Sequence, residues 1–189
     1  RTALRLLKHR SELMDTAGGG AMTALIGFDR KELDKLLSKT EGVVIANDNS
    51  SAQVVLSGNP QSVKAVSGAV TCKRAIPLQV SGAFHSPYMA EASQTFAAEI
   101  DEVIFKNALV PVLSNADPAP TRDGEVLKER LKKQMTAGVR WRETMDVMFN
   151  QGIKTLVEVG PGNALSGLAK RSLKGVAISQ ISNASDLGH

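Results

Sequence analysis

Residues 47–58 read Asn47-Asp48-Asn49-Ser50-Ser51-Ala52-Gln53-Val54-Val55-Leu56-Ser57-Gly58. The polar residues 48–51 separate two runs, 43–47 and 53–56, that are rich in Val, Ile and Leu. Strands bounded by clusters of Asn, Asp and Ser are typical of β-hairpins. This stretch therefore predicts two consecutive strands joined by a short polar turn.

Helix signals follow on both sides of this hairpin. Asp29 is a good N-cap for a helix over residues 30–38. Pro60 is suited to open a second, short helix over residues 61–69. Two outer strands are predicted at residues 22–28 and 73–80. The order strand-helix-strand-strand-helix-strand is the split βαβ pattern of a ferredoxin-like unit.

The rest of the chain alternates between helices and strands. Helices are predicted at residues 1–14, 87–105, 125–135, 142–151 and 163–173. Strands are predicted at residues 110–114, 155–159 and 176–181. Such alternation favours a parallel sheet with helices packed on it, so the sequence predicts an α/β fold.

The composition is that of a globular protein. Of the 189 residues, 42% are hydrophobic and 22% are charged, which suffices for one core or a domain with a small subdomain. Cys72 is the only cysteine, so an intrachain disulfide is excluded, and we expect a reducing, cytoplasmic setting. No apolar run is long enough for a membrane span. The chain starts with Arg1, so we expect a fragment or a processed product.

The charge and aromatic content bear on possible partners. The net charge is only +4, and the chain has one Trp, one Tyr and five Phe. Nucleic-acid binding, which relies on clustered cations and on stacking side chains, is therefore weakly supported. A mildly basic surface is still suited to an acidic protein partner.

His85 is the strongest candidate for proton transfer. It lies in Gly82-Ala83-Phe84-His85-Ser86-Pro87, where Ser86 and Pro87 are suited to start a helix. A helix N-terminus favours neutral imidazole, which is the form that acts as a general base. A histidine that merely closes the turn is the simpler interpretation, and the spacing alone favours it.

Arg10 is the second unusual side chain. In the helix predicted at residues 1–14, it falls in line with the apolar positions Ala3, Leu7 and Met14. A guanidinium on an apolar face is costly unless it meets an anion, although its long stem also allows it to reach water from the helix edge. The sequence leaves both interpretations open.

Several other motifs are absent or weak. Gly160-Pro161-Gly162 follows a predicted strand and precedes a helix, which suits a phosphate cradle, but it fits a tight turn better. No G-x-S-x-G sequence occurs, so the chain contains no nucleophile elbow. The histidines His9, His85 and His189 are scattered and show no metal-ligand spacing, so no metal site is expected.

Several motifs, in order along nearly the whole chain, resemble the malonyl-coenzyme A:acyl carrier protein transacylase family, the acyltransferases of fatty-acid and polyketide synthesis. The stretch 10–14 resembles the helix that follows the family's nucleophile, and 80–87 resembles its catalytic-histidine motif. The residues 47–58 resemble its N-x-N-S-x-x-Q-x-V-x-S-G stretch. The remaining matches are 112–115, Gln134 seven residues before Trp141, and 157–162.

The resemblance implies roles for five residues. His85 would be the base that activates a serine, and the backbone carbonyl of Gln134 would orient its imidazole, as the acidic member does in a Ser-His-Asp triad. Arg10 would bind the malonyl carboxylate through two hydrogen bonds, which would explain a cation on an apolar stripe. Met14 would line the acyl pocket. Phe84 would disfavour an α-methyl branch on the acyl group.

The resemblance also implies a domain layout. Family members carry a ferredoxin-like βαββαβ subdomain inserted in an α/β-hydrolase-like core, a parallel sheet with helices. Residues 17–89 would form the inserted subdomain, and residues 1–16 with 90–189 would form part of the core. The family's G-H-S-x-G nucleophile motif and its oxyanion-hole loop lie upstream of the helix at residues 1–14. We therefore expect a C-terminal portion of a transacylase.

The implied reaction is malonyl transfer from coenzyme A to acyl carrier protein through a serine acyl-enzyme. We expect the chain alone to be inactive, with malonyl-CoA and the carrier protein as partners and no role for nucleic acid or membrane. No cofactor is expected beyond the phosphopantetheine that the partner carries. The alternatives are a non-catalytic module that binds the carrier protein and a truncated product without a function.

Overall fold

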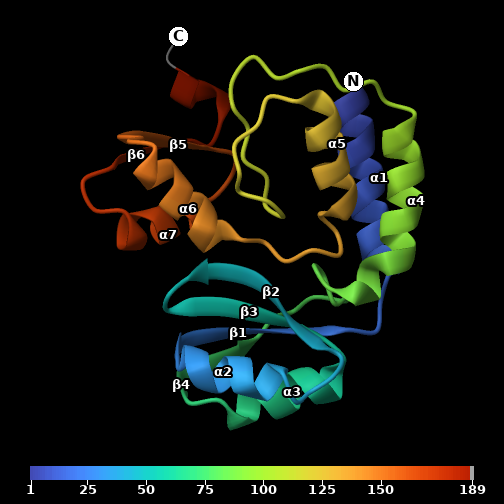
Figure 1. Cartoon of the computed structure of the whole chain (residues 1–189), viewed down its shortest axis with the longest axis vertical. Helices are drawn as coiled ribbons and strands as arrows, with labels where there is room; N and C mark the ends of the chain where they lie inside the picture. The colour runs from blue at the N-terminus through green and yellow to red at the C-terminus, as the bar shows by residue number, and fades with distance from the viewer. Residues whose placement is uncertain (188–189) are drawn as a thin grey trace. The chain divides into compact units, whose positions relative to one another are not determined.

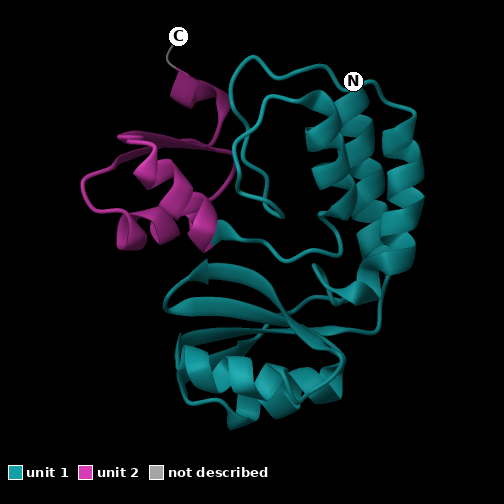
Figure 2. Cartoon of the chain, viewed as in Figure 1, with its two compact units in different colours: residues 1–141 teal, residues 142–189 magenta. Residues whose placement is uncertain are grey.

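The computed structural model describes residues 1–187 of the chain. These residues form two compact units, residues 1–141 and residues 142–187, shown in different colours in Figure 2. His189, one of the three histidines considered above for metal binding, lies outside the described residues. Within residues 1–187, no helix is both long and apolar enough to cross a lipid bilayer.

The first unit contains the predicted split βαβ arrangement. Its sheet has the strand order β2-β3-β1-β4, and every neighbouring pair is antiparallel. This order, read from β4 to β2, is that of a ferredoxin-like unit. The strands are β1 (Ala21–Phe28), β2 (Val43–Ser50), β3 (Gln53–Gly58) and β4 (Cys72–Pro77).

Two helices cover one face of this sheet, α2 (Arg30–Leu37) and α3 (Pro60–Ala69) (Figure 1). Both begin where the sequence predicts. The Asp29 carboxylate accepts from the backbone N–H of Glu32 at 2.9 Å, and Asn59 caps α3 in front of Pro60. The core under the helices consists of buried aliphatic side chains from both layers: Leu25, Leu33, Val43, Val54, Leu56, Val63, Val66 and Val70.

The opposite face of the sheet is apolar as well. Met22 and Ala24 alternate with Leu25 along β1, so they point away from α2 and α3. They form a smaller cluster with Ala46 and Val55, and the half-buried ring of Phe84 packs against it. The segment just before His85 is therefore anchored on the sheet.

Three further helices of the first unit pack side by side: α1 (Thr2–Thr16), α4 (Ala90–Asp101) and α5 (Gly124–Lys133) (Figure 1). A short 3₁₀ helix, η1 (Pro87–Met89), precedes α4. The core of this layer consists of seven buried side chains: Leu6, Met14, Met89, Ala92, Phe96, Ile100 and Met135.

The second unit contains a parallel pair of strands. β5 (Thr155–Val159) and β6 (Ala177–Ile181) pair in register from Thr155 with Ala177 to Val159 with Ile181. The helices of this part are α6 (Trp141–Asn150), which starts at the boundary between the units, α7 (Ala164–Ser172) and the 3₁₀ helix η2 (Ala184–Leu187). The mixed α/β class predicted from the sequence is thus observed.

Several predicted elements are wrong in detail. Residues 110–114 are not a strand, because Val112 makes only an isolated bridge to Thr121 and no neighbouring strand extends it. The last strand of the sheet ends at Pro77 rather than residue 80. The helix predicted over 87–105 is a 3₁₀ turn followed by α4, which ends at Asp101.

The apolar stripe of α1 is only partly buried. Leu6 and Met14 face the core, whereas Leu7 is 58% exposed and Leu4 is 72% exposed. The prediction that Leu7 lies on the apolar, core-facing side of this helix is therefore wrong. The predicted division into residues 17–89 and the remainder stays a prediction.

Candidate active site

His85 lies in a strained turn between β4 and η1. Its backbone φ is +56°, in the left-handed region, and within residues 1–187 it is the only residue other than glycine with a positive φ. The following residue secures the turn, since the buried Ser86 hydroxyl donates to the Ala83 carbonyl at 2.6 Å and accepts from the Tyr88 backbone N–H at 3.3 Å. Ser86 is thus the predicted N-cap, although of η1 rather than a long helix. Strained residues held by their surroundings cluster at functional sites.

The Nδ1 atom of the His85 ring is held by the backbone carbonyl of Gln134. This nitrogen lies 2.9 Å from the carbonyl oxygen of Gln134, the C-cap residue of α5. A carbonyl can only accept, so in the neutral imidazole the proton is on Nδ1. The other nitrogen, Nε2, is then the one with a free lone pair, which is the form of a general base.

The surroundings keep the imidazole neutral. Burial lowers the pKa of His85 below its ordinary value of 6.5, and the nearby positive charge of Arg10 lowers it further. The backbone carbonyls of Gln134 and Ala137 act in the opposite direction, and the pKa remains lowered. The His85 ring is therefore unprotonated at neutral pH.

Arg10 meets the same residue from α1. Its Nη2 donates to the side-chain Oε1 of Gln134 at 2.8 Å. The guanidinium is half-buried, and desolvation lowers its pKa, but arginine stays charged in proteins. The sequence left an anion and water open as partners; among the described residues, the partner of the guanidinium is the amide oxygen of Gln134 and not an anion.

The structure also places the two predicted pocket residues. Met14, one turn along α1 from Arg10, is only 8% exposed and belongs to the helical core. Phe84 is half-buried and packs against both the helical core and the apolar face of the sheet. Hydrogen bonds join His85, Gln134 and Arg10. Phe84 directly precedes His85, Met14 follows Arg10 by one helical turn, and both pack in the helical core.

A model of the acyl transferase domain family matches residues 1–188. This chain belongs to the acyl transferase domain family. The family named from the ordered motifs is thereby confirmed.

Relatives of this acyl transferase domain include named transacylases. A malonyl CoA-acyl carrier protein transacylase from Synechocystis is 49% identical over 98% of this chain and 64% of that protein. Its Bacillus subtilis counterpart is 37% identical over 94% of this chain and 60% of that protein. The chain thus spans about two thirds or less of the curated relatives that it matches.

Solved structures agree with the sequence relatives. The crystal structure of the Synechocystis malonyl-CoA:ACP transacylase matches with a TM-score of 0.95 at 49% identity, over 98% of this chain and 64% of that one. A type II polyketide acyl-carrier protein in complex with its malonyl-transacylase matches with a TM-score of 0.88 at 31% identity, over 98% of this chain and 63% of that one.

One feature of the site of this acyl transferase domain was missed at the sequence level. The motif assigned a role only to the Gln134 backbone, whereas its side chain contacts Arg10. The two residues are separated by 124 positions, and no local pattern in the sequence signals such a contact.

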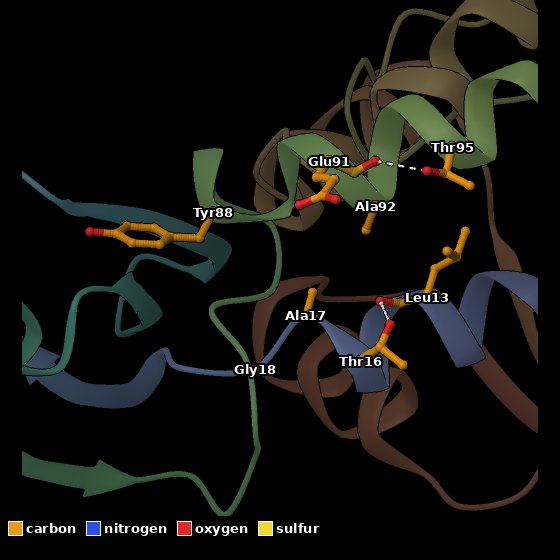
Figure 3. A pocket seen from close by; sticks show the side chains of 8 residues that line it. All are labelled: Leu13, Thr16, Ala17, Gly18, Tyr88, Glu91, Ala92 and Thr95. Atoms are coloured by element: carbon orange, nitrogen blue, oxygen red, sulfur yellow. Dashed lines mark hydrogen bonds between the residues drawn. The ribbon is translucent and has the colours of Figure 1, made fainter.

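The hollow shown in Figure 3 is separate from these residues. It has a volume of about 480 Å³ and lies between the end of α1 and the start of α4. Its lining mixes apolar side chains with hydroxyls and one carboxylate: Leu13, Thr16, Ala17, Gly18, Tyr88, Glu91, Ala92 and Thr95. None of the five predicted site residues lines it.

The Gly160-Pro161-Gly162 turn leads into a helix whose start is already satisfied. The Glu158 carboxylate accepts from the backbone N–H groups of Leu165 at 3.1 Å and Ser166 at 2.8 Å. These N–H groups are the ones that would bind a phosphate at the beginning of α7. The structure therefore agrees with a turn rather than a phosphate cradle.

The neutral state of His85 can be measured directly. Because burial and Arg10 both lower its pKa, we expect the NMR titration of its imidazole to have a midpoint below 6.5, and Arg10→Gln to raise this midpoint. Just below pH 6.5, the unfolded chain, in which His85 has its ordinary pKa, binds more protons than the folded chain. The contribution of His85 to the free energy of unfolding is therefore present above pH 6.5 and is lost as the pH falls below that value. His85→Asn should weaken the dependence of the free energy of unfolding on pH, measured by urea denaturation. An NMR midpoint of His85 above 6.5 would contradict the lowered pKa.

Proposed function

We propose that this chain provides the base and the carboxylate-binding residues of a malonyltransferase that acts between coenzyme A and acyl carrier protein. The observation that carries the proposal is the joining of His85 and Arg10 through one residue, Gln134, at 2.9 Å and 2.8 Å. A neutral imidazole beside a fixed guanidinium suits the transfer of an acyl group that ends in a carboxylate. The names of the relatives support the same reaction.

The reaction proceeds in two acyl transfers. His85 Nε2 accepts the proton of a serine hydroxyl, and the serine oxygen attacks the thioester carbonyl of malonyl-CoA. The C–S bond breaks, and His85 returns the proton to the leaving coenzyme A thiolate. The thiol of the carrier then gives its proton to His85 and attacks the serine ester. The ester C–O bond breaks, and the serine leaves as the alcohol with the proton that His85 returns. The serine is that of the family's G-H-S-x-G motif, which this sequence does not contain.

Three residues would select the acyl group. Arg10 offers N–H groups that pair with the two oxygens of a malonyl carboxylate and with nothing on an acetyl group. Met14 would line the pocket along the same helix face. The ring of Phe84, held between the sheet and the helical core, would leave little room for an α-methyl branch.

The proposed partner is an acyl carrier protein. The solved complex of a 31% identical malonyl-transacylase with its carrier protein supports this choice, and a net charge of +4 suits an acidic partner. The reaction as written needs no cofactor on this chain, since phosphopantetheine belongs to the carrier. A single, unpaired cysteine supports a cytoplasmic location.

The 189-residue chain by itself should form no covalent intermediate. Because the sequence lacks G-x-S-x-G, no activated serine is expected next to His85. After incubation with malonyl-CoA, we expect the intact mass to remain that of the unmodified chain. A stoichiometric increase by one malonyl group, retained after denaturation, would show that another serine of this chain serves as nucleophile.

A hybrid enzyme tests the base. Residues 1–187 would replace the matching portion of the Synechocystis transacylase, which shares 49% identity. We expect the hybrid to transfer malonyl to the carrier protein, and His85→Asn to lower kcat by about 10² to 10⁴-fold, since Asn keeps the left-handed turn but cannot accept a proton as imidazole does. His9→Asn is the matched control, because His9 is also half-buried but pairs with Glu99 at 2.8 Å. Equal rates in the two variants would refute the role of His85.

The same hybrid tests the carboxylate-binding role of Arg10. Arg10→Ala removes the guanidinium, so we expect kcat/KM for malonyl-CoA to fall by about 10² or more while that for acetyl-CoA changes little. Arg5→Ala, an exposed arginine on the same helix, is the control. Equal losses on malonyl-CoA and acetyl-CoA would show that Arg10 acts on the fold rather than on the substrate.

A further inference from the structure

Gln134 has four polar groups that could bind a partner, and the structure accounts for three of them. Its backbone N–H donates to the Leu131 carbonyl at 3.4 Å. Its backbone carbonyl accepts from His85 at 2.9 Å, and its side-chain Oε1 accepts from Arg10 at 2.8 Å. Its side-chain Nε2 is buried and has no hydrogen-bond partner among the described residues. A buried donor without a partner is destabilising and needs an explanation.

Among the described residues, the Arg10 guanidinium beside it has a single hydrogen-bond acceptor, Gln134 Oε1. A guanidinium has five N–H donors, and the contact with Gln134 uses one of them. Within residues 1–187, no carboxylate lies within ion-pair distance of Arg10, although other cations of α1 and of the neighbouring helix α5 form ion pairs. A half-buried cation and a buried amide donor therefore lie together with no anionic partner, an arrangement that suits an anionic acceptor from outside the chain.

We propose that the Gln134 side chain is part of the binding site for the carboxylate of the acyl substrate: Oε1 holds the Arg10 guanidinium in place, and Nε2 donates a hydrogen bond to the substrate carboxylate. This inference rests on the proposed function, since it concerns the same acyl group. It assigns to the Gln134 side chain a role separate from that of its backbone carbonyl, which orients His85.

Substitution of the side chain separates the two roles. The contact with His85 uses the backbone, so it survives any change of the Gln134 side chain. Gln134→Glu keeps the shape but replaces the amide donor with a carboxylate, which would pair with Arg10 and compete with the substrate. Gln134→Leu removes both the acceptor for Arg10 and the free donor.

The test is the binding of malonyl-CoA and acetyl-CoA to the 189-residue chain, measured by isothermal titration calorimetry. We expect the unaltered chain to prefer malonyl-CoA. We expect Gln134→Glu to weaken malonyl-CoA binding by about tenfold or more and Gln134→Leu by a smaller factor, with acetyl-CoA binding changed by less than about twofold. Gln94→Glu, which adds the same charge at an exposed position of α4, should leave both affinities unchanged.

The His85 imidazole signals supply the second measurement. If the variants keep the Nδ1-protonated form in NMR spectra, the fold and the backbone contact are intact, and a selective loss of malonyl-CoA affinity supports the proposal. If malonyl-CoA affinity is unchanged in both variants, or if acetyl-CoA affinity falls by the same factor, the proposal is overturned. If the unaltered chain shows no preference for malonyl-CoA, the carboxylate-binding function of Arg10 fails first, and the role of Gln134 fails with it.

Discussion

The hydrogen bond between His85 Nδ1 and the Gln134 carbonyl, at 2.9 Å, is the contact on which the arrangement of the site depends. It joins the turn that follows the sheet to the end of α5, and it decides which imidazole nitrogen carries the proton. A backbone carbonyl does this without adding a negative charge. The imidazole therefore keeps a lowered pKa, whereas a carboxylate in that place would raise it.

Both partners of this bond are held by the sheet of the first unit. On the His85 side, the Phe84 ring packs on the apolar face formed by β1, β2 and β3. On the Gln134 side, the chain continues to Val139, whose N–H donates to Ala46 at 2.7 Å and whose carbonyl accepts from the Asp48 backbone N–H at 2.9 Å. The edge strand β2 thus fixes the segment after α5, and the strained turn at His85 is held in place from both directions.

The sequence predicts those parts of the fold that local signals determine. Helix-start signals such as Asp29 and Pro60, together with the apolar runs of the strands, locate the split βαβ elements to within a few residues. Residues 110–114 had the same strand-like composition but no partner strand, and pairing rather than composition decides whether a strand forms. The site likewise has one part that local sequence signals predict and one part that depends on long-range contacts. The capped turn predicts the position of His85, but the contact of Arg10 with Gln134 spans 124 positions and could be found only in the folded chain.

The choice of an amide as the partner of Arg10 has a physical consequence for binding. An aspartate or glutamate in place of Gln134 would hold the guanidinium more tightly, but it would neutralise the charge that meets the substrate carboxylate in the proposed function. The amide oxygen restricts the long arginine side chain while the positive charge remains uncompensated, so part of the ordering entropy is lost on folding and not on binding. The same charge lies close enough to His85 to lower its pKa, and a bound carboxylate would offset that effect. In the proposed function, His85 would then gain proton affinity when the substrate that carries the carboxylate is in place.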